Sequence, residues 1–199
     1  VADRVFELAQ RTGLALDIRP VLPMVMRGLP APKVKRMYIM RDVKREADRL
    51  GIPFGRISDP VGRPVERVLA VYPLAQELGR QIDYLHSYFE LGWSRGVDAG
   101  TDAGLRRIVE GAGISWEEAR RRLTRDEWRT EAENNRNAMF DMGLWGVPSF
   151  RLSGPQGEPP LCTWGQDRLW LIEAEITRRA ASDASTPTAA RKDRASTGD

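Results

Sequence analysis

Cysteine and histidine are almost missing from this chain of 199 residues. Cys162 is the only cysteine and His86 is the only histidine. One cysteine forms neither an internal disulfide nor a Cys-x-x-Cys redox pair, and one histidine gives little support to a zinc site or a Ser-His-Asp triad. We therefore expect no metal. The low cysteine usage is typical of a reducing cytoplasm, and Cys162 is interpreted as a small buried apolar residue.

Long apolar runs and long runs of one charge are missing as well. No segment has the length and hydrophobicity of a membrane span, and none resembles a signal peptide. The net charge is +3, but most arginines stand among acids, as in EEARRRLTRDEWR at 117–129. That mixture is typical of a charged helix surface rather than a phosphate-binding stripe. We therefore expect neither a membrane nor nucleic acid as a partner.

The apolar pattern divides the chain into a discontinuous core and an insertion. A helix and a strand come first, a long block with only helical signals follows, and two strands and a helix end the pattern. This order predicts an α/β fold with an all-α insertion. We predict a core at 1–31 and 144–180 and an inserted helical domain at 32–143. Residues 181–199 contain no large apolar side chain, which predicts a disordered tail.

Local signals place some elements more closely. Leu14, Leu16 and Ile18 alternate with polar or small residues and predict a strand at 14–19. The segment from 65 to 96 is compatible with two helices or with one helix kinked at Pro73.

Two helix starts carry capping signals. Thr101 precedes an amphipathic segment and is expected to be its N-cap. Ser115 is followed three residues later by Glu118, which predicts a capping box.

Four segments carry a resemblance to a known family. They are RPVLPMVMRG at 19–28, KRMYIMRDVKREADRLGIPF at 35–54, GLWGVPSF at 143–150 and WGQDRL at 164–169. They are similar to 2-hydroxychromene-2-carboxylate isomerases and kappa-class glutathione transferases, both members of the wider DsbA-like group. The resemblance extends over about residues 4–178. It implies a thioredoxin-like fold with an inserted helical domain, commonly dimeric, that uses glutathione to act on an aromatic-derived small molecule.

Pro148 follows Val147 at the point where a predicted strand begins. Because proline has no N–H to donate to a sheet, it is found at the first residue of a strand, on an edge strand or at a bulge. The resemblance implies a cis Val147–Pro148 bond. It also implies that the Val147 backbone pairs with glutathione as a short added strand. The alternative is a trans proline that simply opens an edge strand.

The resemblance assigns three further residues to glutathione. Asp167 would bind its ammonium group, backbone N–H groups near Gln166 would bind the adjacent carboxylate, and Lys35 would lie near the glycyl end. The simpler interpretations are that Asp167 is a favourable acid in a first helical turn and that Lys35 lies on a solvated helix face.

Aromatic residues supply candidates for a substrate wall. Trp145 and Trp164 flank the proposed site in the sequence, and Tyr38 shares a helix face with Lys35. The remaining tryptophans are interpreted as core or packing residues. They are Trp93, Trp116, Trp128 and Trp170.

The sequence departs from the family pattern at two points. The family's Ser-Pro-aromatic segment, with the central strand that precedes it, would lie before Val1. Leu29 stands where the isomerases have an asparagine. Because the central strand pairs with both neighbours, 14–19 and 149–152, its loss would leave their backbone groups unpaired. We therefore expect an upstream strand, in the same chain or in a tandem domain.

Two other functions stay open on these residues. A degenerate thioredoxin-fold module, such as one half of a tandem protein, would bind or scaffold without catalysis, and the two departures favour it. A thiol-disulfide oxidoreductase is the third possibility, which the lone Cys162 argues against.

Overall fold

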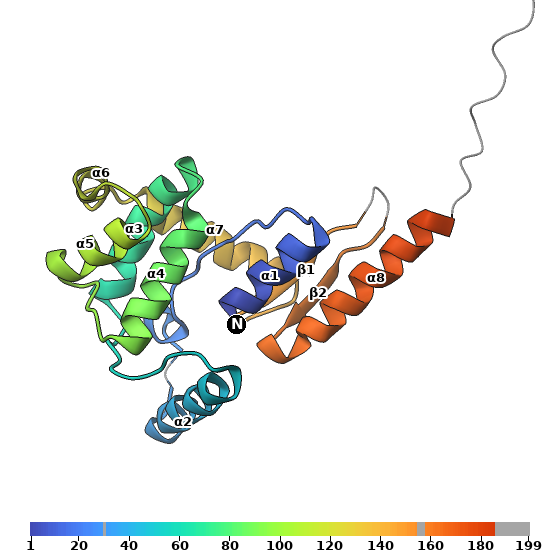
Figure 1. Cartoon of the computed structure of the whole chain (residues 1–199), viewed down its shortest axis with the longest axis horizontal. Helices are drawn as coiled ribbons and strands as arrows, with labels where there is room; N and C mark the ends of the chain where they lie inside the picture. The colour runs from blue at the N-terminus through green and yellow to red at the C-terminus, as the bar shows by residue number, and fades with distance from the viewer. Residues whose placement is uncertain (30, 155–157, 186–199) are drawn as a thin grey trace, which may run out of the picture.

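Helices make up most of the molecule (Figure 1). The computed structural model of the protein describes residues 1–29, 31–154 and 158–185. Its helices are α1 Ala2–Thr12, α2 Lys33–Leu50, α3 Arg63–Glu77, α4 Gln81–Ser94, α5 Asp102–Gly111, α6 Trp116–Arg122, α7 Glu127–Asp141 and α8 Leu169–Ser185, with 3-10 turns η1 Met24–Arg27 and η2 Gln166–Arg168, and its strands are β1 Ser149–Leu152 and β2 Leu161–Trp164.

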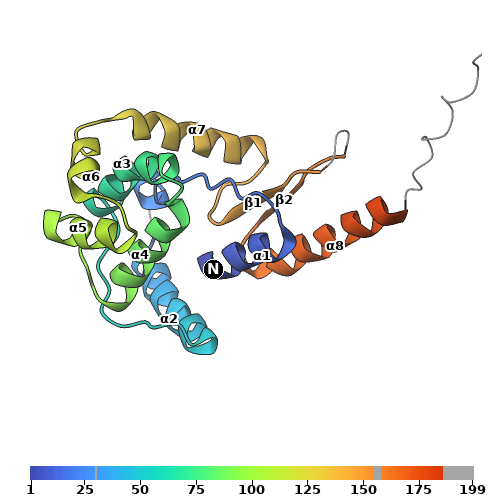
Figure 2. The same cartoon turned by 45° about the horizontal axis from the view of Figure 1, so that its top comes forward.

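The elements form two groups in space. Helices α3 to α7 gather at one end, whereas α1, β1, β2 and α8 lie together at the other, and α2 runs along the side (Figures 1 and 2). Helix α1 connects the groups, because it packs against both α4 and α8. The predicted α/β fold with a helical insertion is confirmed, although the predicted domain boundaries stay predictions.

The sheet is smaller than the sequence predicts. Strands β1 and β2 pair antiparallel, with Ser149 opposite Trp164 and Leu152 opposite Leu161. Cys162 lies in β2 and is half-buried rather than buried. The two strands form the whole sheet of the described residues.

The strand predicted at 14–19 is not formed, and this prediction is wrong. The segment is extended, but a strand also needs a neighbouring backbone, and the described part of the chain offers none. Side chains of the helical block bind this segment instead. The Tyr72 hydroxyl donates to the Ile18 carbonyl at 3.1 Å, and the Asn135 amide donates to the Pro20 carbonyl at 3.0 Å.

The main hydrophobic core lies inside the helical block. It is formed by α3, α4, α5 and α6, whose apolar faces meet. Helix α5 shows why: its apolar residues are spaced three and four apart, and they face inward while its arginines face solvent. The largest fully buried side chains are Tyr84, Leu105, Ile108, Val68, Val71 and Val109.

The helix boundaries settle the open alternatives. The segment from 65 to 96 forms two helices, since the chain breaks at Gly79, which takes a φ of 65°. Thr101 is confirmed as the N-cap of α5, because its hydroxyl accepts the Gly104 N–H at 3.0 Å. The capping box at Ser115 is wrong: Ser115 begins α6 without a side-chain cap bond, and the buried Ala119 holds this short helix to the core.

The last helix is longer than predicted. Helix α8 continues to Ser185, so the tail does not begin at residue 181. The rest of the predicted tail, 186–199, lies outside the described residues. None of the helices that the structure describes combines the length and the hydropathy needed to cross a bilayer.

Three buried tyrosines should make the fold sensitive to alkaline pH. Burial raises the pKa of Tyr88 to about 12 and raises the pKa values of Tyr72 and Tyr84 above the usual range. The unfolded chain releases these protons near pH 10, so above that pH it binds fewer protons than the folded state. The contribution of these tyrosines to the free energy of unfolding should therefore stay constant below pH 10. Above pH 10 the free energy of unfolding should fall by up to ~1.4 kcal/mol per pH unit for each tyrosine.

Urea unfolding followed by circular dichroism at several values between pH 9 and pH 11.5 would measure this loss. Tyr88→Phe is the matched variant, since no described residue shares a hydrogen bond with the Tyr88 hydroxyl. It should lose less stability than the wild type above pH 10. Equal slopes for the two proteins would contradict the assignment.

Candidate functional site

The corner before β1 is built around a cis peptide bond. The Val147–Pro148 bond is cis, as the resemblance implies, and not trans. The Gly165 N–H donates to the Pro148 carbonyl at 3.0 Å, and the Ser149 hydroxyl donates to the Gly146 carbonyl. The bond from Gly165 attaches the corner to the turn that follows β2. The GVP and WGQD segments, which are about twenty residues apart in the sequence, therefore lie next to each other in the structure.

The Val147 backbone is open at this corner. The residue is 60% exposed, and its N–H and C=O form no hydrogen bond with a described residue. Pairing between β1 and β2 begins only at Ser149. An extended ligand can therefore pair with Val147 without displacing a bond already made.

Trp145 and Trp164 form an aromatic pair beside this corner. Their ring centroids are 5.2 Å apart and their planes are tilted by 38°. The side chains are 58% and 46% exposed, so the pair presents apolar surface beside the corner. Gly146 lets them meet, because a Cβ there would lie 2.4 Å from the Trp164 indole nitrogen. The structure thus brings together two of the three residues predicted to line a substrate wall, Trp145 and Trp164.

The turn after β2 carries the next two predicted residues. The Gln166 side-chain oxygen accepts a hydrogen bond from Arg4 Nη2 at 3.1 Å, whereas the Asp167 carboxylate is exposed and pairs with Arg168 at 2.7 Å. Gly165 precedes them with a φ of 103°, and its Cβ would meet the Asp167 carboxylate. Arg4 was missed by the sequence analysis, because no motif marks a side chain from α1 at this turn.

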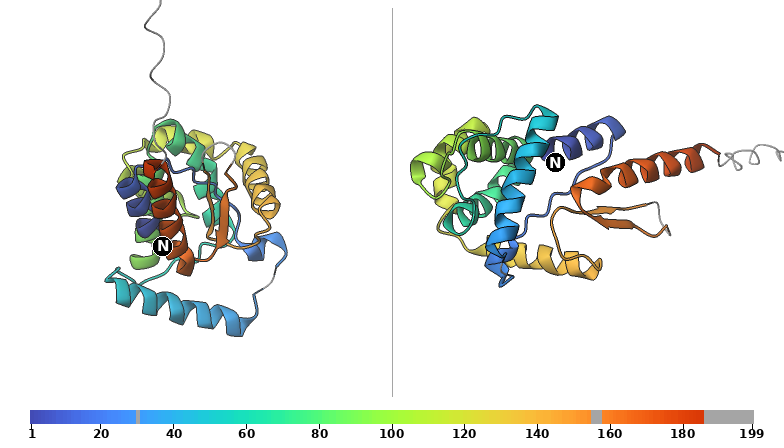
Figure 3. Two further views of the ribbon diagram at one scale, coloured as in Figure 1. Left: turned by 90° about the vertical axis from the view of Figure 1, so that its right-hand side faces the viewer. Right: turned by 90° about the horizontal axis from the view of Figure 1, so that it is seen from below.

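Lys35 and Tyr38 lie apart from this corner on α2. Both side chains are exposed, and neither makes a hydrogen bond or ion pair with a described residue. Helix α2 runs beside the molecule with few packing contacts (Figure 3). The structure does not join these residues to the tryptophan pair, so their assignment to the site stays a prediction.

The other tryptophans divide between core and surface. Trp128 is buried, and Trp93 stacks against Phe54 with ring centroids 6.4 Å apart, as expected for packing residues. Trp170 is 63% exposed on α8, so its interpretation as a core residue is wrong.

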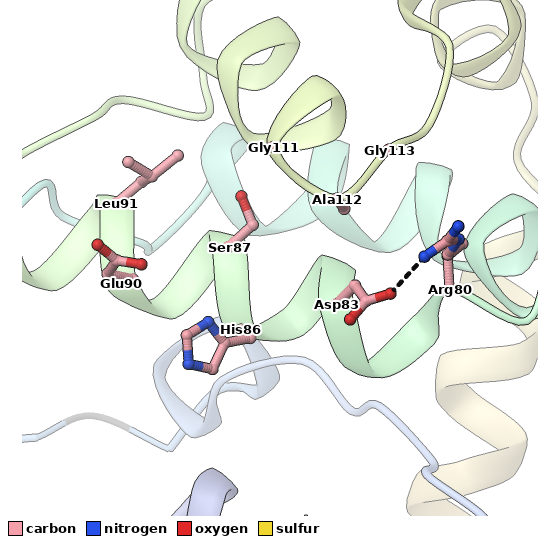
Figure 4. A pocket seen from close by; sticks show the side chains of 9 residues that line it. All are labelled: Arg80, Asp83, His86, Ser87, Glu90, Leu91, Gly111, Ala112 and Gly113. Carbon is pink, nitrogen blue, oxygen red and sulfur yellow. Dashed lines mark hydrogen bonds and ion pairs between the residues drawn. The ribbon is translucent and has the colours of Figure 1, made fainter.

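A cavity of about 460 Å³ lies elsewhere, between α4 and the end of α5 (Figure 4). Its polar side chains are largely engaged: Arg80 pairs with Asp83 at 3.0 Å, and the Ser87 hydroxyl donates to the Ile108 carbonyl at 2.8 Å. No three potential metal ligands gather anywhere among the described residues. Because the Ser87 hydroxyl donates its proton to the Ile108 carbonyl and forms no hydrogen bond with His86 or Glu90, which also line the cavity, we do not assign catalytic chemistry to it.

Comparison with known proteins decides the family. The sequence profile of the DSBA-like thioredoxin domain matches residues 2–177, which is most of the chain. The chain belongs to the DSBA-like thioredoxin domain family. The fold expected from the sequence resemblance is therefore confirmed. No match was found among curated proteins.

Two solved structures share this fold. One is a 2-hydroxychromene-2-carboxylate isomerase, with a TM-score of 0.74 and 21% identity, over 94% of this chain and 92% of that one. The other is a protein from Nitrosomonas europaea whose assignment as a protein disulfide isomerase is provisional. Its TM-score is 0.66 at 16% identity, over 89% of this chain and 90% of that one. At these identities the likeness concerns the fold alone, and it supports the family suspected from the sequence.

Proposed function

We propose that this protein is a glutathione-dependent isomerase or transferase of the hydroxychromene-carboxylate and kappa type. The main supporting observation is the Val147 corner, where an open backbone edge lies beside an exposed tryptophan pair. An open edge suits a tripeptide, and a tilted aromatic pair suits a flat substrate. The substrate would be a small aromatic-derived molecule, and the protein would act in the cytoplasm as a homodimer or beside an upstream tandem domain.

The residues present fit glutathione at three points. The Val147 backbone would pair with its cysteine, the turn at Gln166 would bind its γ-glutamyl carboxylate, and Asp167 would bind its ammonium group. The resemblance assigns Lys35 to the glycyl end, although α2 lies apart from this corner in the structure. When bound, glutathione would supply a thiolate that adds to an unsaturated substrate and is eliminated after rotation about the weakened bond. Trp145 and Trp164 would exclude water from one side of that substrate.

The first test is a titration with glutathione. Binding should change the tryptophan fluorescence, because Trp145 and Trp164 are exposed at the proposed site. We expect saturation within the millimolar range, and we expect loss of the change when Asp167→Asn removes the proposed ammonium partner. Trp170→Phe is the control, because Trp170 is exposed on α8 outside the pair. The fluorescence change should persist in that variant.

A second function, a scaffold without catalysis, is supported by one observation. The extended segment at 14–19 has no strand partner in the described part of the chain, and β1 pairs on one side only. Such edges can accept a strand from another polypeptide. Absence of glutathione binding at millimolar concentration would favour this function. Reduction of insulin disulfides would instead favour a thiol-disulfide oxidoreductase, although the lone Cys162 cannot form a dithiol.

A further inference from the structure

The cavity between α4 and the end of α5 has no part in the proposed function (Figure 4). Its volume of about 460 Å³ lies within the range of about 300–1,000 Å³ that is typical of small-molecule sites. It lacks an activated nucleophile, but binding without reaction needs only a complementary lining. What this cavity can bind is therefore decided by the hydrogen-bonding groups and the charges of that lining.

Ser87 places a hydroxyl oxygen in the wall of this cavity. Aromatic residues aside, Ser87 is the only residue with a polar side chain that is buried in the described part of the chain, at 8% exposed. Its hydroxyl donates to the Ile108 carbonyl at 2.8 Å, and its oxygen accepts no hydrogen bond from a described residue. Because a hydroxyl oxygen has two lone pairs, Ser87 can still accept a hydrogen bond from a ligand.

Gly111 keeps that oxygen uncovered. This glycine lies in the last turn of α5 and lines the same cavity. A Cβ at this position would lie 2.8 Å from the Ser87 Oγ, a closer contact than real Cβ atoms make. Since glycine is among the least favourable residues in a helix, its presence here is consistent with a need for space beside Ser87.

The charges of the lining favour a cation. Arg80 is the one lysine or arginine of the lining, and its guanidinium is paired with Asp83 at 3.0 Å. The Glu90 carboxylate, by contrast, forms no hydrogen bond or ion pair with a described residue. His86 also lines the cavity, and it faces a further carboxylate, that of Asp3, at 3.7 Å. Among the described residues, the lining thus has an unpaired negative charge and no unpaired positive charge.

The end of α5 adds backbone acceptors. The carbonyls of Gly111, Ala112 and Gly113, which all belong to the lining, accept no hydrogen bond from a described residue. The last carbonyls of a helix carry a partial negative charge and stabilise a cation nearby. Leu91 contributes an apolar side chain to the same lining. Hydrogen-bond acceptors from both helices and one apolar side chain therefore line the cavity.

We propose that this cavity binds a small alkylammonium compound, that is, a primary amine in its protonated form. An ammonium group has three donors, for which Glu90 supplies the opposite charge, and Ser87 and the α5 carbonyls supply further acceptors. Ser87 and Glu90 are three residues apart on α4, and such residues are neighbours on a helix surface, so one ammonium group can contact both. The alkyl chain lies against Leu91, four residues from Ser87 on the same helix face.

The test titrates two small molecules of similar size against the whole chain at constant ionic strength. They are n-butylammonium chloride, which has the charge, and n-butanol, which does not. Backbone amide NMR follows residues 111–113, which line the cavity. We expect saturable shifts with butylammonium and at least tenfold weaker binding of butanol, because a neutral molecule forms no charged hydrogen bond with Glu90.

Two variants test the lining, and a third is the control. Glu90→Gln removes the charge of an exposed side chain and should weaken butylammonium binding about tenfold. Gly111→Ala adds a methyl group against the Ser87 oxygen and should weaken binding to a similar extent. Glu110→Gln is the matched control, because Glu110 pairs with Arg106 at 2.8 Å and lies outside the lining. Its affinity should equal that of the wild type, and far-ultraviolet circular dichroism should show the same helix content in every variant.

Four results would overturn the proposal. They are equal affinity for butylammonium and butanol, equal affinity of the wild type and Glu90→Gln for butylammonium, an equal loss in Glu90→Gln and Glu110→Gln, and no saturable binding of butylammonium at all. The lining includes no residue of the Val147 corner. None of these results would therefore affect the proposed function, which the glutathione titration tests.

Discussion

Replacing Gly104 with alanine should destabilise the protein by about 3 kcal/mol, near the upper end for an overpacked core position. Gly104 lies in the first turn of α5, and a Cβ there would be 1.9 Å from the Asp98 carbonyl oxygen. That oxygen already accepts the N–H and the hydroxyl of Thr101. The backbone cannot move away without breaking these bonds and the Thr101 cap, so the strain exceeds the gain in helix propensity of about 1 kcal/mol.

Gly92→Ala is the matched control for this prediction. Gly92 lies inside α4, and a Cβ there meets no atom within 4 Å. Alanine should therefore stabilise the protein by about 0.5–1 kcal/mol. Urea unfolding followed by circular dichroism would measure both variants. Similar free energies of unfolding for Gly104→Ala and the wild type would show that the loop at Asp98 adapts, contrary to the packing described above.

Replacing Gly146 with alanine should break the tryptophan pair and weaken the proposed site. A Cβ at this position would lie 2.4 Å from the Trp164 indole nitrogen, so the ring must move. Trp164 directly precedes Gly165, whose N–H binds the Pro148 carbonyl, and the movement should therefore reach the turn at Gln166. Because misplacement by about 1 Å can reduce turnover about 10²-fold, we expect glutathione-dependent activity to fall by that order.

The pair can be tested without any ligand. Two close, tilted indoles should give a distinct near-ultraviolet circular dichroism signal, which Gly146→Ala should reduce strongly. The helix content should be unchanged, since the three atoms nearest to a Cβ at Gly146 all belong to Trp164. Trp164→Phe, which removes one ring without adding bulk at the corner, should give the same spectral loss. A near-ultraviolet spectrum identical to that of the wild type would contradict the expected displacement.

Much of the candidate site was predictable because its residues lie in short sequence segments. The segments GLWGVPSF and WGQDRL each contain a tryptophan of the pair and the glycine next to it. The structure joins them through the bond between Gly165 and Pro148. Arg4 was not predictable, because an arginine in an amphipathic helix gives no sign of its distant partner. Lys35 and Tyr38 share a helix face as predicted, but periodicity does not reveal how far α2 lies from the corner.

The sequence by itself determined the order of the elements, the helical insertion and the start of α5, because these depend on local periodicity and on a capping residue such as Thr101. Tertiary structure decided the rest. Alternating apolar residues at 14–19 favour an extended chain, but a strand requires a second backbone at hydrogen-bonding distance. The described part of the chain offers none, and the Ile18 carbonyl accepts the Tyr72 hydroxyl instead. The meeting of Trp145 with Trp164, and of Arg4 with Gln166, likewise depends on contacts between segments far apart in the chain, which no local pattern encodes.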